Sequence, residues 1–185
     1  MAANALRREA LLDAAIAVLA ERGTRGLTFR AVDANAGTPV GTASNYFANR
    51  DELIAQVFEQ IGVRLAPDPD EVDRLSQRTP STELFADYMR YIVAGLSAER
   101  DVTIALFELR LEASRNPEIA DLVQQWLDTG FAADVAFNTN AGLPGGKDQI
   151  ALFHYALDGL MLDRLTASID PVSYTHLTLP TSDLV

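Results

Sequence analysis

Residues 27–54 read LTFRAVDANAGTPVGTASNYFANRDELI, and their pattern is the most informative in the sequence. Thr28 is a good N-cap, and Phe29 and Val32 follow it at helical spacing, so a short helix is predicted to begin here. Gly37 ends that helix, because glycine readily takes the left-handed conformation found at helix C-termini. A short helix, a glycine turn and a second short helix together predict a helix-turn-helix.

The second short helix is expected at about residues 39–46, and its composition is unusual for a core helix. Pro39 fits its first turn, where the missing N–H is harmless. Only Ala43 and Phe47 are clearly available for packing, and the other side chains are small and mostly polar. Hydroxyl, amide and phenol groups on a thin helix suit a DNA major groove about 12 Å wide, where base edges offer donors and acceptors.

The segment AGTPVGTASNYFANRDELI, preceded by AAIAVLAERGTRGLTFRAV, resembles the DNA-binding domain of TetR-family transcriptional regulators. The similarity covers about residues 8–60. It consists of a helix ended by Gly23, the run GLTFRAV, the glycine turn, the NYF end of the recognition helix and a basic residue at the start of the fourth helix. One departure lies in the middle of the recognition helix, where the family often has a large apolar or aromatic pair and this chain has Ala43 and Ser44. The base contacts of the family therefore do not all transfer to this sequence.

The resemblance implies a set of DNA contacts. Thr28, Tyr46 and Arg50 would bind phosphates. Base edges would be contacted by Arg30, Val40, Gly41, Thr42, Ser44 and Asn45. The chemistry agrees, because arginine suits guanine, asparagine suits adenine, and methyl groups suit the thymine methyl. In the alternative interpretation, Thr28 is only a helix cap and Tyr46 only a packing residue.

The fold class predicted from this pattern is all-α with two parts. An N-terminal three-helix helix-turn-helix domain occupies residues 1–64, with its fourth helix as a bridge, and an antiparallel helical domain for effector binding and dimerisation occupies residues 65–170. Apolar residues at helical spacing predict helices at about 4–22, 50–64, 82–96, 100–114, 117–138 and 148–168, with a possible short helical turn at 69–76. Residues 171–185 lose this period and resemble translated adapter or vector sequence, so they are a doubtful tail, native or non-native, and are excluded from the fold prediction.

The helix at about 148–168 is apolar over more than one stripe, which predicts burial on two sides. The resemblance implies that its second side meets a second copy, in a four-helix bundle with the helix at 117–138. The alternative is a central core helix in a monomer. The candidate lining of an effector pocket is Tyr88, Tyr91, Phe107, Trp126, His154 and Met161. Aromatic residues at helical spacing are also typical of an ordinary core, so each has a packing interpretation as well.

Composition narrows the class of protein. The chain has 185 residues, no cysteine and a net charge of −11. Without cysteine, disulfides and thiolate metal sites are excluded. No run approaches the roughly 20 apolar residues of a membrane span, and the N-terminus has no signal-peptide pattern, so a cytoplasmic protein is expected. Residues 1–64 carry seven basic and seven acidic groups, so the excess of acid lies entirely in the rest of the chain. Residues 1–64 can bind DNA despite having no net charge if their arginines face the phosphates.

These observations predict a ligand-responsive TetR-like repressor that binds a palindromic double-stranded DNA operator as a homodimer. A small-molecule effector of unknown identity would release it. No catalytic residue, metal or cofactor is expected. One alternative is a small-molecule-binding or dimerisation module without specific DNA binding. Another is a metal-dependent hydrolase using His154 and Asp158, which lie four residues apart and would share a helix face.

Overall fold

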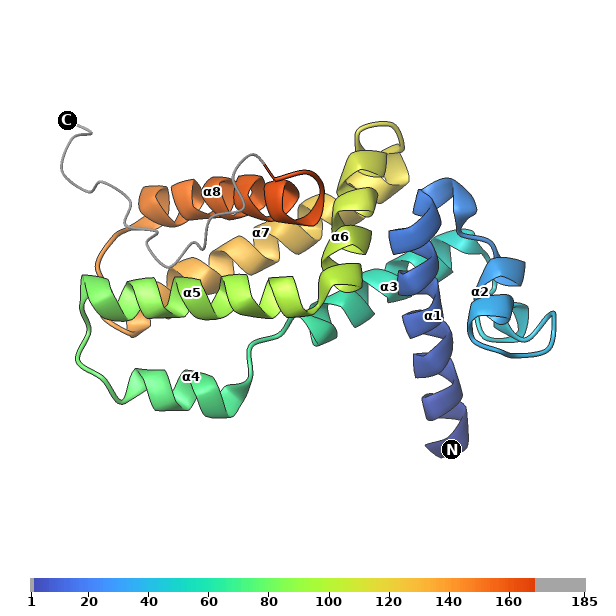
Figure 1. Ribbon diagram of the computed structural model, residues 1–185, viewed down its shortest axis with the longest axis horizontal. Coiled ribbons are helices and arrows are strands. Elements are labelled where there is room, and N and C mark those ends of the chain that lie inside the picture. The colour runs from blue at the N-terminus through green and yellow to red at the C-terminus, as the bar shows by residue number, and fades with distance from the viewer. Residues whose placement is uncertain (1, 169–185) are drawn as a thin grey trace. The chain divides into compact units, whose positions relative to one another are not determined.

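A computed structural model describes residues 2–168, with side chains described from residue 4. This part of the chain is helical and contains no strand (Figure 1). Its elements are α1 (Ala2–Gly26), α2 (Phe29–Asn35), the 3-10 helix η1 (Ala43–Asn45), α3 (Arg50–Arg64), α4 (Pro69–Ser76), α5 (Thr82–Ala98), α6 (Arg100–Ala113), α7 (Pro117–Asn140) and α8 (Lys147–Leu165). None of these helices is both long enough and apolar enough to cross a bilayer.

The predicted all-α fold is confirmed. Two predictions made from local sequence also hold in detail: α4 begins and ends where the short helical turn was expected, and α3 spans 50–64. Gly23 interrupts α1 with φ of 65°, so the first straight stretch ends there as predicted, and one further turn follows the kink. The interpretation of residues 171–185 as a non-native tail lies outside the described residues.

The chain forms two compact units, which do not follow the order of the sequence. Within the described residues, the first contains the chain up to Ala66 together with Ala98–Thr129, and the second contains Pro67–Ser97 together with residues 130–168. Residue 64 was predicted as the end of a DNA-binding domain. The compact first unit extends beyond that point, because α6 and the first half of α7 pack with the N-terminal helices. Residues 1–64 as the functional DNA-binding segment remain a prediction.

In the first unit, α1 is the central helix and packs against α2, α3 and α6. The apolar side of α1 supplies Leu11, Ala15 and Leu19, none of which has any exposed surface. They meet a fully buried stripe of α3 that includes Leu53 and Ile61. This core supports α2 and η1 from behind and leaves the outer surface of the helix-turn-helix free for contact with another molecule.

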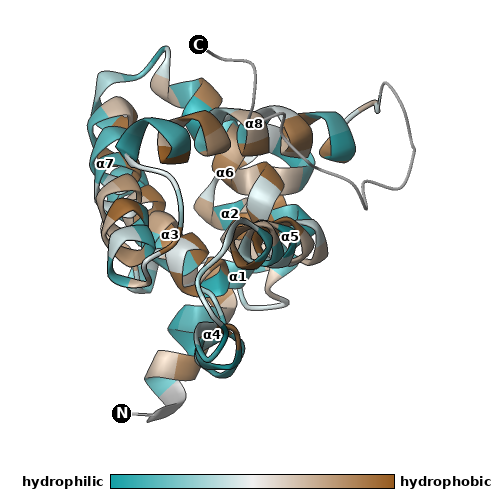
Figure 2. Ribbon diagram, turned by 90° about the vertical axis from the view of Figure 1, so that its left-hand side faces the viewer, coloured by the Kyte–Doolittle hydropathy of each residue, from teal (hydrophilic) through white to brown (hydrophobic). Residues whose placement is uncertain are grey.

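In the second unit, α4, α5, the second half of α7 and α8 share a smaller core. Its buried members are Leu75, Leu84, Phe85, Tyr88, Leu143 and Ile150. Aromatic rings meet edge to face, with centroids 4.5 Å apart for Phe85 and Phe153 and 5.2 Å apart for Tyr88 and Phe137. Hydrophobic and hydrophilic residues alternate along helix α8, as the hydropathy colouring shows (Figure 2).

Candidate nucleic-acid interface

The turn between α2 and η1 has the geometry that its sequence predicts. Thr28 caps α2, and its Oγ1 accepts a hydrogen bond from the Ala31 amide at 3.2 Å. Gly37 takes φ of 63° at the C-terminal end of α2. There the amides of Gly37 and Thr38 donate to the carbonyls of Ala34 and Asp33 at 3.3 and 2.9 Å, as in a Schellman motif. The N-cap and the glycine stop are therefore both confirmed.

The recognition element itself differs from the prediction. The sequence predicted a helix over 39–46, but only Ala43–Asn45 is helical, as a single 3-10 turn flanked by turns and bends. The reason is Gly41, whose φ of 94° cannot belong to a right-handed helix. Most of the remaining backbone bonds are i to i−3 bonds, from Thr42 to Pro39 and from Asn45 to Thr42. The element is thus a tight, irregular loop rather than an α-helix.

The side chains predicted to read bases are nevertheless at the surface. Val40 is 79 % exposed, the highest exposed fraction among the large apolar residues described as exposed. Ser44, Asn45 and Arg30 are exposed, and Thr42 is half-buried. Ala43 and Phe47 point inward and have almost no exposed surface, so the element has one buried side and one open side.

Two hydroxyl groups on the open side are already oriented by the loop. Thr42 Oγ1 donates to the Pro39 carbonyl at 2.6 Å, and Ser44 Oγ donates to the Gly41 carbonyl at 2.9 Å. With their protons used inside the loop, these oxygens present lone pairs outward. They suit the amino groups of adenine and cytosine, whereas Asn45 retains both a donor and an acceptor for adenine.

The three predicted phosphate contacts lie in different environments. Thr28 is exposed. Tyr46 is half-buried and packs against the first-unit core. Arg50 is half-buried, and its Nη2 donates to the Thr24 carbonyl at 2.8 Å, which ties the start of α3 to the end of α1. Arg50 therefore has a structural bond in addition to its proposed contact with DNA.

The start of α3 has the predicted cap. Asn49 Oδ1 accepts from the Glu52 amide at 2.8 Å, and Glu52 reaches back to the Ala48 amide at 2.7 Å. The return bond ends one residue earlier than in the standard capping box, but it satisfies the same kind of free amide. This cap fixes the loop between the recognition element and α3.

Sequence reasoning missed two residues that hold the recognition element. Arg8 of α1 donates to the Tyr46 carbonyl at 2.9 Å, and its guanidinium carbon lies 5.5 Å from the centroid of the Phe47 ring. Asp33 of α2 is only 1 % exposed and accepts from the amides of Gly41 and Ala43, each at 2.7 Å. A signal for Asp33 was present in the sequence, because it lies four residues after Phe29, on the buried side of α2.

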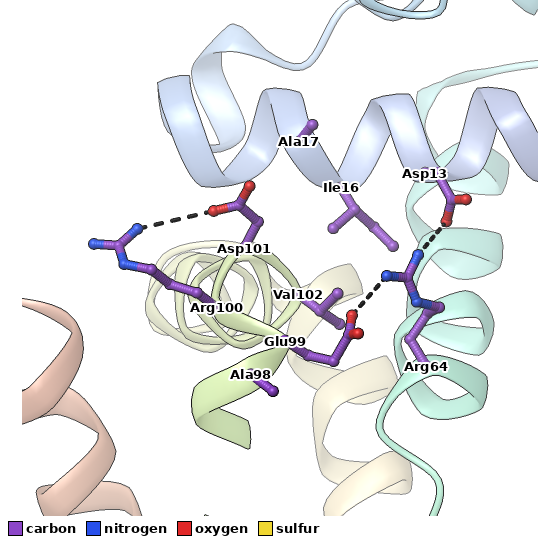
Figure 3. Close-up of a pocket in the computed structure, with 9 residues that line it drawn as sticks. All are labelled: Asp13, Ile16, Ala17, Arg64, Ala98, Glu99, Arg100, Asp101 and Val102. Carbon is purple, nitrogen blue, oxygen red and sulfur yellow. Dashed lines mark hydrogen bonds and ion pairs between the residues drawn. The ribbon is translucent and has the colours of Figure 1, made fainter. Parts of the chain in front are cut away.

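The first unit also contains a polar hollow of about 330 Å³ among α1, the end of α3 and the start of α6 (Figure 3). Arg64 crosses it, lying 3.1 Å from Asp13 and 2.6 Å from Glu99. The charged groups of this hollow pair with one another. We therefore interpret it as a junction that joins three helices rather than as a binding site.

The predicted effector-pocket residues do not form one group. Phe107 and Trp126 belong to the first compact unit, whereas the other four belong to the second: Tyr88, Tyr91, His154 and Met161. Within the second unit, the Tyr91 hydroxyl accepts from the Asp68 amide at 2.7 Å, and Met161 is buried. A pocket lined by all six residues remains a prediction.

Two of the second-unit candidates have informative surroundings. His154 Nε2 lies 3.0 Å from Asp134 Oδ2 of α7. No group of three potential metal ligands occurs in the part of the chain that the structure describes. Tyr88 is 5 % exposed, burial raises the pKa of its hydroxyl, and that hydroxyl has no hydrogen-bond partner among the described residues.

The fold and this outward-facing loop define a helix-turn-helix protein of the DNA-binding class. The sequence profile of the bacterial regulatory proteins of the tetR family matches residues 11–57, and that of the tetracyclin repressor-like C-terminal domain matches residues 80–180. The chain belongs to the TetR family, and it is a ligand-responsive transcriptional regulator.

Solved structures agree with this assignment. A TetR-family member from Streptomyces coelicolor A3 is 27 % identical to this chain. The match covers 86 % of this chain and 87 % of that protein's chain, with a TM-score of 0.65. The multidrug binding protein EbrR, complexed with ethidium, is also 27 % identical, with coverage of 86 % and 87 % and a TM-score of 0.62. EbrR complexed with imidazole is 28 % identical, with coverage of 86 % and 84 % and a TM-score of 0.61. No curated protein matches this sequence significantly.

Proposed function

We propose that the protein is a non-enzymatic repressor that binds a palindromic operator as a homodimer and leaves it when a small molecule binds. The observation that carries the proposal is the two-sided recognition element. Its inner residue Ala43 is fully buried, while Val40, Ser44 and Asn45 are exposed. An exposed apolar side chain between polar ones has no role in the core and suits the methyl and amide edges of A·T base pairs.

A dimer is supported by exposed apolar residues on α8. Leu152 is 52 % exposed, Tyr155 is 70 % exposed and Leu162 is 50 % exposed. We call these three residues the α8 patch. We propose that the α8 patch packs against a second copy, with α7 contributing to a four-helix bundle. Two recognition elements would then have to lie roughly 34–36 Å apart to enter successive major grooves.

The effector is proposed to be a planar aromatic molecule that binds in the second unit. Support comes from the edge-to-face rings of α5, α7 and α8 and from the buried Tyr88 hydroxyl, which has no hydrogen-bond partner within residues 2–168. A ligand nitrogen or oxygen could satisfy that hydroxyl while its rings stack with the aromatic side chains. EbrR, a protein of similar fold, is complexed with the planar dyes proflavin and ethidium.

Operator binding is tested by gel shift of the purified protein on the DNA upstream of its own gene. Asn45→Ala and Arg30→Ala should each weaken binding by about 5- to 150-fold, because a good base contact contributes roughly 1–3 kcal/mol. Asn140→Ala removes an exposed amide from the end of α7 and serves as the matched control. Arg50→Ala is a poorer test, because it also removes the bond to Thr24. If the protein binds upstream and scrambled DNA equally well, the alternative function is favoured: a small-molecule-binding or dimerisation module that does not bind specific DNA.

Effector release is tested with ethidium and proflavin as probes. Each should raise the melting temperature of the protein and weaken its binding to the upstream fragment, because a ligand shifts a two-state equilibrium only through its differential affinity for the two states. A dye that stabilises the protein but leaves DNA affinity unchanged contradicts the release mechanism.

A further inference from the structure

Asp33 is a buried carboxylate to which the family comparison gives no role. It is 1 % exposed, on the inner side of α2. An ionised carboxylate is costly to bury unless donors compensate it. Here Oδ2 accepts from the Gly41 amide at 2.7 Å, and Oδ1 accepts from the Ala43 amide at 2.7 Å and from Thr38 Oγ1 at 3.4 Å.

The two short bonds join α2 to a segment that has little regular structure of its own. From Gly37 to Ala43 the chain passes through two glycines with positive φ and a proline, and it becomes helical only at Ala43, where η1 begins. Hydrogen bonds donated to a charged acceptor are roughly twice as strong as those between neutral groups. Asp33 is therefore well suited to hold this loop in one conformation.

The anchored amides lie next to the residues proposed to read DNA. Gly41 stands between Val40 and Thr42, and Ala43 stands between Thr42 and Ser44. Val40, Thr42 and Ser44 are therefore each adjacent in sequence to a residue whose backbone amide is held by Asp33. A small shift of either amide would move the reading groups by a similar distance, and direct readout depends on such positions.

We propose that Asp33 is the positioning residue for operator recognition: its carboxylate sets the conformation of the recognition loop from inside the protein and does not itself touch DNA. This inference rests on the proposed function, since it assumes that the loop reads an operator. It predicts that loss of the carboxylate lowers specific binding more than it lowers binding to DNA in general.

The test compares Asp33→Asn with wild type on two DNA fragments of equal length, the upstream fragment and a scrambled one. The asparagine has nearly the same shape, but it replaces one acceptor oxygen with a donor that opposes a backbone amide. We expect affinity for the upstream fragment to fall about tenfold or more, because a buried donor loses its partner. Affinity for the scrambled fragment should change by less than about threefold, because phosphate contacts dominate it.

Two matched variants separate the anchor from other effects. Asp51→Asn removes the same charge from an exposed position in α3, and it should change the affinities for both fragments by the same small factor. Thr38→Val removes the weakest of the three donors and leaves both amide bonds, so its effect should be clearly smaller than that of Asp33→Asn. Equal effects of Thr38→Val and Asp33→Asn would overturn the proposal.

A second measurement does not depend on DNA. Amide hydrogen exchange followed by NMR should show Gly41 and Ala43 protected in wild type and exchanging faster in Asp33→Asn, while amides of α1 and α3 keep their protection. Unchanged protection of Gly41 and Ala43 refutes the anchor, even if DNA binding falls. Lost protection with an unchanged preference for the upstream fragment refutes the positioning role. If wild-type protein shows no preference at all, the proposed function fails, whereas the exchange data still decide whether Asp33 holds the loop.

Discussion

The two compact units of this chain differ in how completely each buries its own apolar residues. Among the described residues, the core cluster of the first unit has 22 buried apolar members and that of the second has six. The second unit also contains the α8 patch and the buried Tyr88 hydroxyl, for which the described part of the chain offers no hydrogen-bond partner. Apolar surface left in water is unfavourable, at roughly 25 cal/mol per Å². The first unit also exposes large apolar side chains, among them Val40, Val63 and Leu111, but it has the larger core of its own. The second unit has the smaller core, so we expect it to depend more on contacts with other molecules.

The largest expected effect comes from the core of the first unit. Leu19 of α1 has no exposed surface, so Leu19→Ala should lower the free energy of unfolding by about 2–5 kcal/mol. Leu111→Ala, at a leucine of α6 that is 57 % exposed, is the control and should change it by less than about 0.5 kcal/mol. Chemical denaturation followed by fluorescence of Trp126, which packs against this core, measures both. Similar losses for the two variants would mean that the first unit is not the closed core described above.

The next effect tests whether the second unit is completed by another copy. Leu162→Glu places a charge in the α8 patch, where a dimer would bury it, so the dissociation constant of the dimer should rise at least about 100-fold. Leu111→Glu introduces the same charge at a similarly exposed leucine outside the patch and should leave the dimer intact. Sedimentation equilibrium distinguishes the two. A wild-type protein that stays monomeric at high concentration would refute the dimer altogether.

The sequence predicted the first unit better than the second. The helices of the first unit were predictable because their caps and stops are local: Thr28, Asn49 and Gly37 act on neighbours within a few residues. The recognition element was wrongly predicted as a helix. The segment is too short for its periodicity to show that Gly41 takes a positive φ, which a right-handed helix does not allow. Asp33 was missed as a loop anchor, since its partners are eight and ten residues away along a turn whose path the pattern did not define.

The candidate effector site was harder to predict for a different reason. Helical spacing shows which side of a helix is apolar, but not which neighbour that side meets. Phe107 and Trp126 have the same pattern as Tyr88, yet they lie in the other compact unit. Similarly, the spacing of His154 and Asp158 suggested a pair on one helix, while the carboxylate beside His154 is Asp134 of α7. Long-range packing decides such partners, and a single sequence does not encode it in any local pattern.

A smaller effect concerns the acid stability of the first unit. Hydrogen bonds from Arg115 and from Thr24 Oγ1 lower the pKa of Glu112 below its ordinary value of 4.5. A carboxylate with a lowered pKa in the folded protein stabilises it above the unfolded pKa, and this contribution is lost as the pH falls through the folded pKa. Glu112→Gln should therefore lower the melting temperature at pH 7, and this loss should become smaller as the pH falls below about 4.5. Glu59→Gln removes an exposed acid from α3 and should show no such dependence.

The smallest effect on stability is expected at Tyr88, and it separates packing from ligand binding. Because the hydroxyl is buried without a partner, Tyr88→Phe removes a polar group that contributes no hydrogen bond within the described residues. The free energy of unfolding should change by less than about 1 kcal/mol and could rise. Ethidium binding, measured by fluorescence titration, should weaken about 5- to 10-fold if the hydroxyl bonds to the ligand. Operator affinity without dye should stay the same, which serves as the internal control. A large loss of stability would instead mean that the hydroxyl supports the fold, and the second unit would then be more self-sufficient than its exposed α8 patch suggests.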